Sequence, residues 1–204
     1  MQFRTLAILL LFPLSACTQR HANTPDHAQP LPISLEGWAS ETFALPPGFA
    51  PDLPSGSESL RFAPGWRTPD AEGFWSYAFI MSIDEPVPDA ARLRVLLEKY
   101  YNGLMATFAA GQATHPSPQL EPARIDILPT TTNRYEATMH LTDAFATFKP
   151  ITLRVLIQTA PHPASSTTTK SVPRSLVRIQ LSPQPPSHPI WRSLDAALAS
   201  IPTP

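Results

Sequence analysis

Apolar and polar side chains alternate along four segments in the second half of the chain: residues 124–128, 134–142, 151–159 and 175–181. Strict alternation predicts a β-strand with one buried face and one exposed face. No helical pattern separates these segments. We therefore expect the strands to pair antiparallel and to form a sheet with one apolar face and one wet face.

The first half of the chain predicts further extended segments. Residues 38–54 contain several prolines, which favour an extended backbone. Residues 59–63 predict a short strand with Leu60 and Phe62 on one side. Residues 74–83 predict a stronger strand, because bulky apolar side chains at the odd positions alternate with mostly small ones at the even positions.

Two segments carry a helical pattern. Asp89 can cap the start of a long helix over residues 89–111, and Gly111 can close its end. A short helix is expected over residues 190–201, near the end of the chain. The long helix has its apolar stripe at Leu93, Leu96, Leu97, Tyr100, Leu104 and Phe108, and the short one at Trp191, Leu194, Leu198 and Ile201.

Together these elements predict an α+β domain over residues 35–204. We expect a single antiparallel sheet, with the long helix packed on its apolar face and a short C-terminal helix. In its order of elements the domain resembles the PsbP/Mog1-like domains, which also begin with a proline-marked strand. The resemblance rests on topology alone and implies nothing about activity.

The start of the chain has the three-part layout of a secretory signal peptide. Arg4 precedes an apolar run over residues 6–14, and the small residues Ser15 and Ala16 follow it. The run is far shorter than the roughly 20 residues that a helix needs to span a bilayer. Residues 1–16 are therefore expected to direct export and to be removed.

The next residue gives this signal a more specific interpretation. Leu14-Ser15-Ala16-Cys17 resembles the lipobox of bacterial lipoproteins, and Cys17 is the single cysteine of the chain. The resemblance implies cleavage before Cys17, acylation of that cysteine and anchoring to a membrane. In enteric-type lipoproteins an Asp after the cysteine favours retention at the inner membrane. Thr18 stands at this position instead, so the outer membrane, facing the periplasm, is expected. The alternative is an ordinary secretory signal with a cysteine nearby by chance.

Residues 17–34 are polar and proline-rich and lack an apolar period, so they predict a flexible tether between the lipid and the domain. The composition also removes several classes of function. The net charge is -1 and Lys and Arg do not cluster, which argues against nucleic acid as a partner. No metal-ligand spacing, phosphate loop or nucleotide fingerprint occurs in the sequence, so we predict no metal and no cofactor.

The polar face of the predicted sheet is the first candidate binding surface. It carries Arg134, Glu136, His140, Arg154 and Arg178, and arginine side chains suit carboxylate or phosphate groups. The alternative is a plain solvent-exposed face with cross-strand ion pairs. His140 with the nearby acid Glu136 also leaves open a periplasmic hydrolase that transfers protons through this pair.

Trp66 is the second candidate, because an exposed tryptophan in the polar loop 65–75 can anchor a partner protein. The alternative is that Trp66 and Trp75 close one end of the core. We therefore expect a lipid-anchored envelope module that binds a partner or ligand without catalysis. The hydrolase and a purely structural envelope role are the other possibilities. The sequence does not indicate an oligomeric state.

Overall fold

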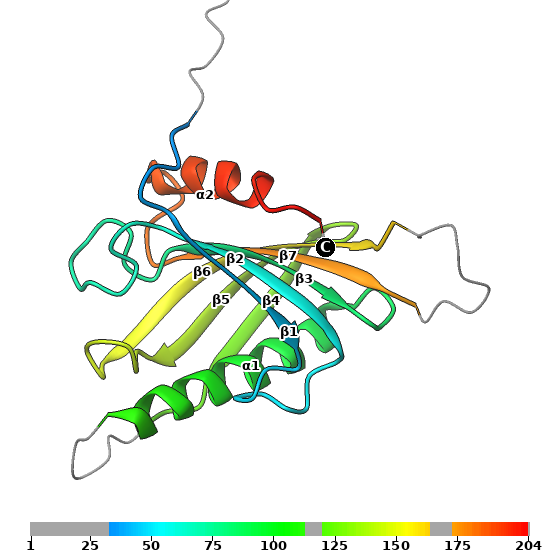
Figure 1. Ribbon diagram of the computed structural model, residues 1–204, viewed down its shortest axis with the longest axis horizontal. Coiled ribbons are helices and arrows are strands. Elements are labelled where there is room, and N and C mark those ends of the chain that lie inside the picture. The colour runs from blue at the N-terminus through cyan, green and yellow to red at the C-terminus, as the bar shows by residue number, and fades with distance from the viewer. Residues whose placement is uncertain (1–32, 113–119, 164–172, 204) are drawn as a thin grey trace, which may run out of the picture. The chain divides into compact units, whose positions relative to one another are not determined.

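The alternating segments pair as one antiparallel sheet in the computed structural model, which describes residues 33–112, 120–163 and 173–203 (Figure 1). The predicted leader, Cys17 and nearly all of the tether lie outside these residues. In chain order the strands are β1 (Ala39–Leu45), β2 (Gly56–Phe62), β3 (Tyr77–Ile83), β4 (Arg124–Thr131), β5 (Arg134–Thr142), β6 (Pro150–Pro161) and β7 (Ser175–Ser182).

Hydrogen bonding places the seven strands in the order β1-β2-β3-β7-β6-β5-β4. The three strands before the long helix and the four after it form two consecutive groups, and β3 joins β7 where they meet. The extended segment predicted over residues 38–54 contributes the edge strand β1, which the sequence pattern does not resolve as a strand of its own. The predicted single antiparallel sheet is confirmed.

The long helix α1 (Ala90–Gly111) covers one face of the sheet (Figure 1). The Asp89 side chain caps its start by accepting a hydrogen bond from the backbone N–H of Arg92, at 2.8 Å. Leu93, Leu96, Leu97 and Tyr100 of the predicted stripe are buried, whereas Leu104 and Phe108 pack on the core edge and are half-buried. Burial of this stripe against the strands forms the main core.

The short helix α2 (Ile190–Ala199) covers part of the opposite face (Figure 1). Its Leu194 and Ala197 pack on Ala78 of β3, and Leu198 packs near Ile80 of the same strand. The expectation of one wholly wet face is therefore wrong for the centre of the sheet. The small side chain of Ala78 in β3 allows the second helix to approach the sheet closely there.

The other half of that face, over β4, β5 and β6, stays open. Its side chains Asp126, Leu128, Glu136, Arg154 and Leu156 are all exposed. The domain thus has three layers at its centre, α1, the sheet and α2. At the β4 side it has two, α1 and the sheet. None of the helices in the described part of the chain is long and apolar enough to cross a membrane.

Candidate functional site

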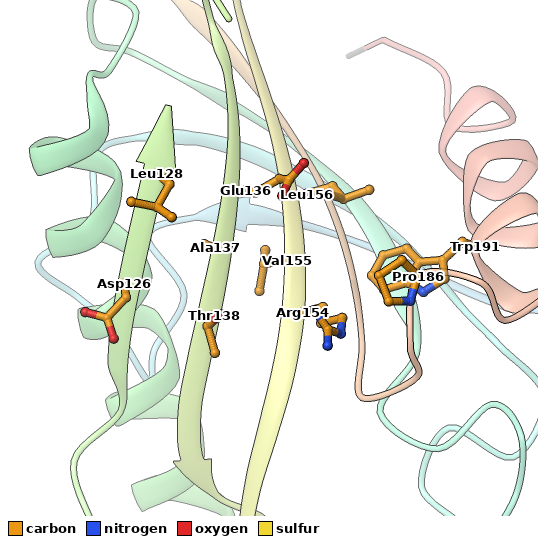
Figure 2. Close-up of a pocket in the computed structure, with 10 residues that line it drawn as sticks. All are labelled: Asp126, Leu128, Glu136, Ala137, Thr138, Arg154, Val155, Leu156, Pro186 and Trp191. Carbon is orange, nitrogen blue, oxygen red and sulfur yellow. The ribbon is translucent and has the colours of Figure 1, made fainter. Parts of the chain in front are cut away.

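The open half of the sheet and the start of α2 enclose a groove of about 380 Å³. Figure 2 shows its floor on β4, β5 and β6 and its side wall at Pro186 and Trp191. The lining residues are Asp126, Leu128, Glu136, Ala137, Thr138, Arg154, Val155, Leu156, Pro186 and Trp191. Apolar walls with a few polar groups are the usual make-up of a binding site.

Strand register arranges the floor of the groove in two rows. Leu128, Glu136 and Leu156 lie opposite one another across β4, β5 and β6. Asp126, Thr138 and Arg154 form the neighbouring row, two residues along each strand (Figure 2). An apolar row interrupted by one carboxylate therefore runs beside a row that carries one negative and one positive charge.

The two leucines of the floor are unusually open to solvent. Leu128 is 69% exposed and Leu156 is 39% exposed. Single exposed apolar residues are ordinary, but here two leucines, on either side of Glu136, line the same groove as a tryptophan. Such a grouping is typical of a surface that contacts another molecule.

Trp191 is held in place at the rim of the groove. Its indole N–H donates to the carbonyl oxygens of Gln184 and Pro185, at 3.3 and 3.0 Å. Its ring also packs against the buried cluster of Ala78, Leu194 and Ala197 on the α2 side of the sheet. Because the polar edge is already bonded, the ring offers the groove an apolar and preorganised surface.

A second hollow of about 320 Å³ adjoins the groove and shares Glu136 and Leu156 with it. Across β5, β6 and β7, Arg134 lies opposite Gln158, and Gln158 lies opposite Arg178. Arg178 is half-buried there, and the neighbouring Gln180 is buried and donates to the Asp195 carboxylate of α2 at 2.8 Å. This hollow is therefore partly roofed by α2.

The predicted arginines do not form one cluster. Arg134, Arg154 and Arg178 come from the adjacent strands β5, β6 and β7 and share one face. Arg154, however, stands four residues along β6 from Gln158, which is roughly 13 Å. Among the described residues, the ion pairs are Arg92–Glu85, Lys99–Asp52 and Arg174–Asp84, and none involves this face.

His140 lies on the same face but away from the groove. It stands four residues along β5 from Glu136, again roughly 13 Å, and its Nδ1 is hydrogen-bonded to the Thr152 hydroxyl at 2.9 Å. The hollow beside His140 includes Glu121, whose backbone N–H donates to Thr142. The pair His140–Glu136 is therefore not assembled, and no group of three potential metal ligands occurs within the described ranges.

The loop tryptophans lie on the other side of the sheet, with the main core. Trp66 is half-buried and stacks on Phe62 at 4.4 Å between ring centroids. Trp75 is fully buried and donates its N–H to Asp143 at 3.0 Å. Asp143 also accepts from the backbone N–H groups of Phe145 and Thr147, so it fixes the loop that faces Trp66. Trp66 thus packs at the end of the core.

One polar feature was not expected from the sequence. Glu58 of β2 points to the α1 side and is completely buried, and its Oε1 accepts a hydrogen bond from the Tyr100 hydroxyl at 3.0 Å. Burial raises the pKa of Glu58 to about 8, and the nearby charge of Glu41 contributes to the rise. The available signal was the alternation Glu58, Leu60, Phe62, which places a glutamate on an apolar strand face.

The chain matches no protein-family model, no curated protein and no solved structure. Its function therefore has to be argued from the site itself.

Proposed function

We propose that this chain is a lipid-anchored protein of the bacterial cell envelope whose domain binds a partner protein through the groove beside α2. The observation that carries the binding proposal is the incomplete cover of one sheet face. The short helix protects β3 and β7, and it leaves Leu128 and Leu156 exposed next to the fixed ring of Trp191.

A protein segment suits this groove better than a highly charged small molecule. The floor pairs an apolar row with a row that carries Asp126 and Arg154, so it offers hydrophobic contact with charges of both signs beside it. Protein interfaces commonly combine an apolar centre with a polar rim that sets specificity. A phosphate or carboxylate ligand would favour clustered arginines, and Arg154 lies in a different row from Arg134 and Arg178.

The partner is proposed to dock by side-chain contact rather than by adding a strand. β4 is the edge of the sheet on this side, and an unpaired edge is a template for strand addition. Pro129 interrupts this edge because proline has no backbone N–H to donate. The exposed leucines of the floor then supply the contact.

The test is photo-crosslinking in living cells, with benzoylphenylalanine in place of Leu156. The matched control places the same group at Val95, a residue of α1 that is exposed to a similar extent, 42% against 39%. We expect one discrete protein adduct from position 156 and none from position 95. Equal adducts at both positions, or none from either Leu156 or Leu128, would contradict the proposal.

The captured partner then allows a quantitative measurement. Leu156→Arg should weaken its binding by roughly tenfold or more, because it removes a central apolar contact and places a long charged side chain in the groove. The control Val95→Arg should leave the dissociation constant unchanged. A partner that binds both variants equally well docks elsewhere on the domain.

A further inference from the structure

A separate hollow, called the aromatic hollow below, lies on the opposite side of the sheet from the groove, between α1 and the strands β1 and β2. Its volume is about 160 Å³. That corresponds to roughly five water molecules at about 30 Å³ each, so it has room for a small ligand only. Its wall is dominated by aromatic rings, among them Phe43, Phe49, Phe62, Trp66, Phe108 and Phe145.

Close backbone packing forms one side of this hollow. Gly103 of α1 meets the backbone of Phe49, and a Cβ at Gly103 would lie 1.9 Å from the Phe49 carbonyl oxygen. Phe49 is thereby held edge-on to Tyr100, with 5.1 Å between the ring centroids. This packing fixes the backbone that carries the Phe49 ring on this side of the hollow.

The aromatic wall already attracts a cation of the chain itself. The guanidinium carbon of Arg67 lies 5.5 Å from the ring centroid of Trp66, 5.3 Å from that of Phe108 and 5.6 Å from that of Phe145. Cations within about 6 Å of a ring centroid are drawn to the negative face of the ring. Arg67 is exposed at the edge, so it leaves the interior of the hollow free.

Negative groups lie around the same hollow. Glu41 belongs to its lining. Glu58 lies directly behind the wall, because its strand partner Phe43 and its hydrogen-bond donor Tyr100 both line the hollow. Glu58 is fully buried, and its second oxygen, Oε2, has no hydrogen-bond partner among the described residues.

An unsatisfied buried carboxyl oxygen is costly to the fold. An apolar side chain at this position would stabilise the core better, so the packing itself gives no reason for the glutamate. A cation bound in the hollow would explain the glutamate. In the low dielectric of the interior, a carboxylate attracts a positive charge even where the two groups do not touch.

We propose that the hollow under α1 binds a small organic cation, of the trimethylammonium or alkylammonium class, against its aromatic wall, with the carboxylate of Glu58 behind that wall. This site is distinct from the groove beside α2 and does not depend on it. The aromatic rings contact the apolar body of the cation, and Glu58 with Glu41 balances its charge.

Binding is coupled to a proton. Burial raises the pKa of Glu58 to about 8, so near neutral pH the empty site holds Glu58 protonated. A bound cation favours the carboxylate, and the proton then leaves for the solvent. The other titratable groups near Glu58 are Glu41 on β1, Tyr77 on β3, and Tyr100 and Tyr101 on α1; burial keeps the tyrosine pKa values above the ordinary range.

The test is isothermal titration of the purified full chain with choline and with its uncharged isostere 3,3-dimethylbutan-1-ol. We expect choline to bind at least tenfold more tightly than the alcohol. Its apparent affinity should rise by about tenfold per pH unit up to about pH 8, and the heat should vary with the buffer because a proton is released. Equal binding of the two probes, or no binding of choline, overturns the proposal.

Variants separate the roles of the charges. Glu58→Gln, a neutral mimic of the protonated side chain, should weaken choline binding and abolish both the pH dependence and the proton release. Arg67→Ala should strengthen choline binding, because it removes a competing cation from the rings. The control Glu36→Gln, at an exposed residue outside the hollow, should change neither.

Titration with butyrate tests whether the hollow prefers an anion to a cation. If butyrate binds in place of choline and loses its affinity in Arg67→Ala, the hollow takes an anion held by Arg67, and the proposal is wrong. Unchanged choline affinity and proton release in Glu58→Gln would equally overturn the role given to that carboxyl group.

Discussion

Two buried side-chain atoms in the described part of the chain lack a hydrogen-bond partner, Oε2 of Glu58 and Oγ1 of Thr159. Ser76 and Ser182 share a hydrogen bond of 2.8 Å, Tyr77 and Tyr101 share another of 2.8 Å, and Asp143 organises a whole loop. Glu58 differs because one of its carboxyl oxygens is left without a partner among the described residues, in a core made largely of rings. Its protonation state therefore bears on the stability of the whole domain.

Glu58→Gln should remove a pH dependence of the free energy of unfolding. The pKa of Glu58 is about 8 in the folded state, against an ordinary value of 4.5, so the unfolded chain gives up the proton more readily. Stability is then full below about pH 4.5, falls as the pH rises to about 8 and is level above it. Between pH 5 and pH 8 the loss can reach about 4 kcal/mol, at about 1.4 kcal/mol per unit.

Urea denaturation at these two pH values measures the effect. The wild-type chain should be less stable at pH 8 than at pH 5, and Glu58→Gln should show a flatter profile and higher stability at pH 8. Glu36→Gln, at an exposed position, should follow the wild type. A Glu58→Gln variant with an undiminished pH dependence would place the responsible group elsewhere.

Single residues also mark what the sequence could not predict about the site. Arg178 and Gln180 alternate with apolar neighbours and so predict a wet strand face, yet α2 covers them. Alternation reports that a side chain is polar, and it does not report which long-range element lies above it. Alternation places Leu128 and Leu156 on the polar face, in phase with Asp126 and Arg154, but it does not report that α2 stops short and leaves them exposed.

At the scale of elements, local patterns predicted most of the fold. The helix α1 and the strands β5, β6 and β7 follow directly from their periods of 3.6 and 2. β1 was harder, because prolines surround it and its side chains are mostly exposed at the sheet edge. The strand order needed contacts between β3 and β7 that lie about a hundred residues apart, which no local pattern contains.

The apolar stripe of α1 can be tested against a neighbour on the same helix. Leu97 is 1% exposed and faces the sheet, whereas Val95 is 42% exposed. Leu97→Asp should lower the free energy of unfolding by about 4 kcal/mol or more, because it buries an unpaired charge. Val95→Asp should change it by less than about 0.5 kcal/mol. Thermal or urea unfolding of both variants checks the difference, and similar losses would show that the helix does not pack by this stripe.

At the scale of the whole molecule, the two proposed sites lie on opposite sides of one sheet. The groove lies beside α2, and the aromatic hollow lies under α1. These two helices cover opposite faces of the sheet (Figure 1). The central strand β3 contributes to both cores, since Phe79 packs toward α1 and Ala78 packs toward α2. The domain can therefore present two surfaces without either one covering the other.

The anchor proposed at Cys17 predicts a defined chemical change. Cys17→Ala should abolish incorporation of an alkyne-labelled palmitate and leave the precursor uncleaved, because the thiol that accepts the lipid is gone. Thr18→Ala, one residue further on, should still be labelled and cleaved. Labelling of cells, followed by mass spectrometry of the mature amino terminus, measures both. A lipidated Cys17→Ala variant, or a wild-type chain cleaved without lipid, would contradict the anchor.

The way the chain joins the domain has a mechanical consequence. Leu35 and Trp38 pack against the cluster of Ala78, Leu194 and Ala197 between the sheet and α2, and only then does the chain enter the edge strand β1. A pull on the chain before Ile33 therefore loads these ring and leucine contacts first. An edge strand that is pulled from one end loses its hydrogen bonds to the neighbouring strand one at a time. The contacts of Leu35 and Trp38 therefore protect β1 from this loss under tension.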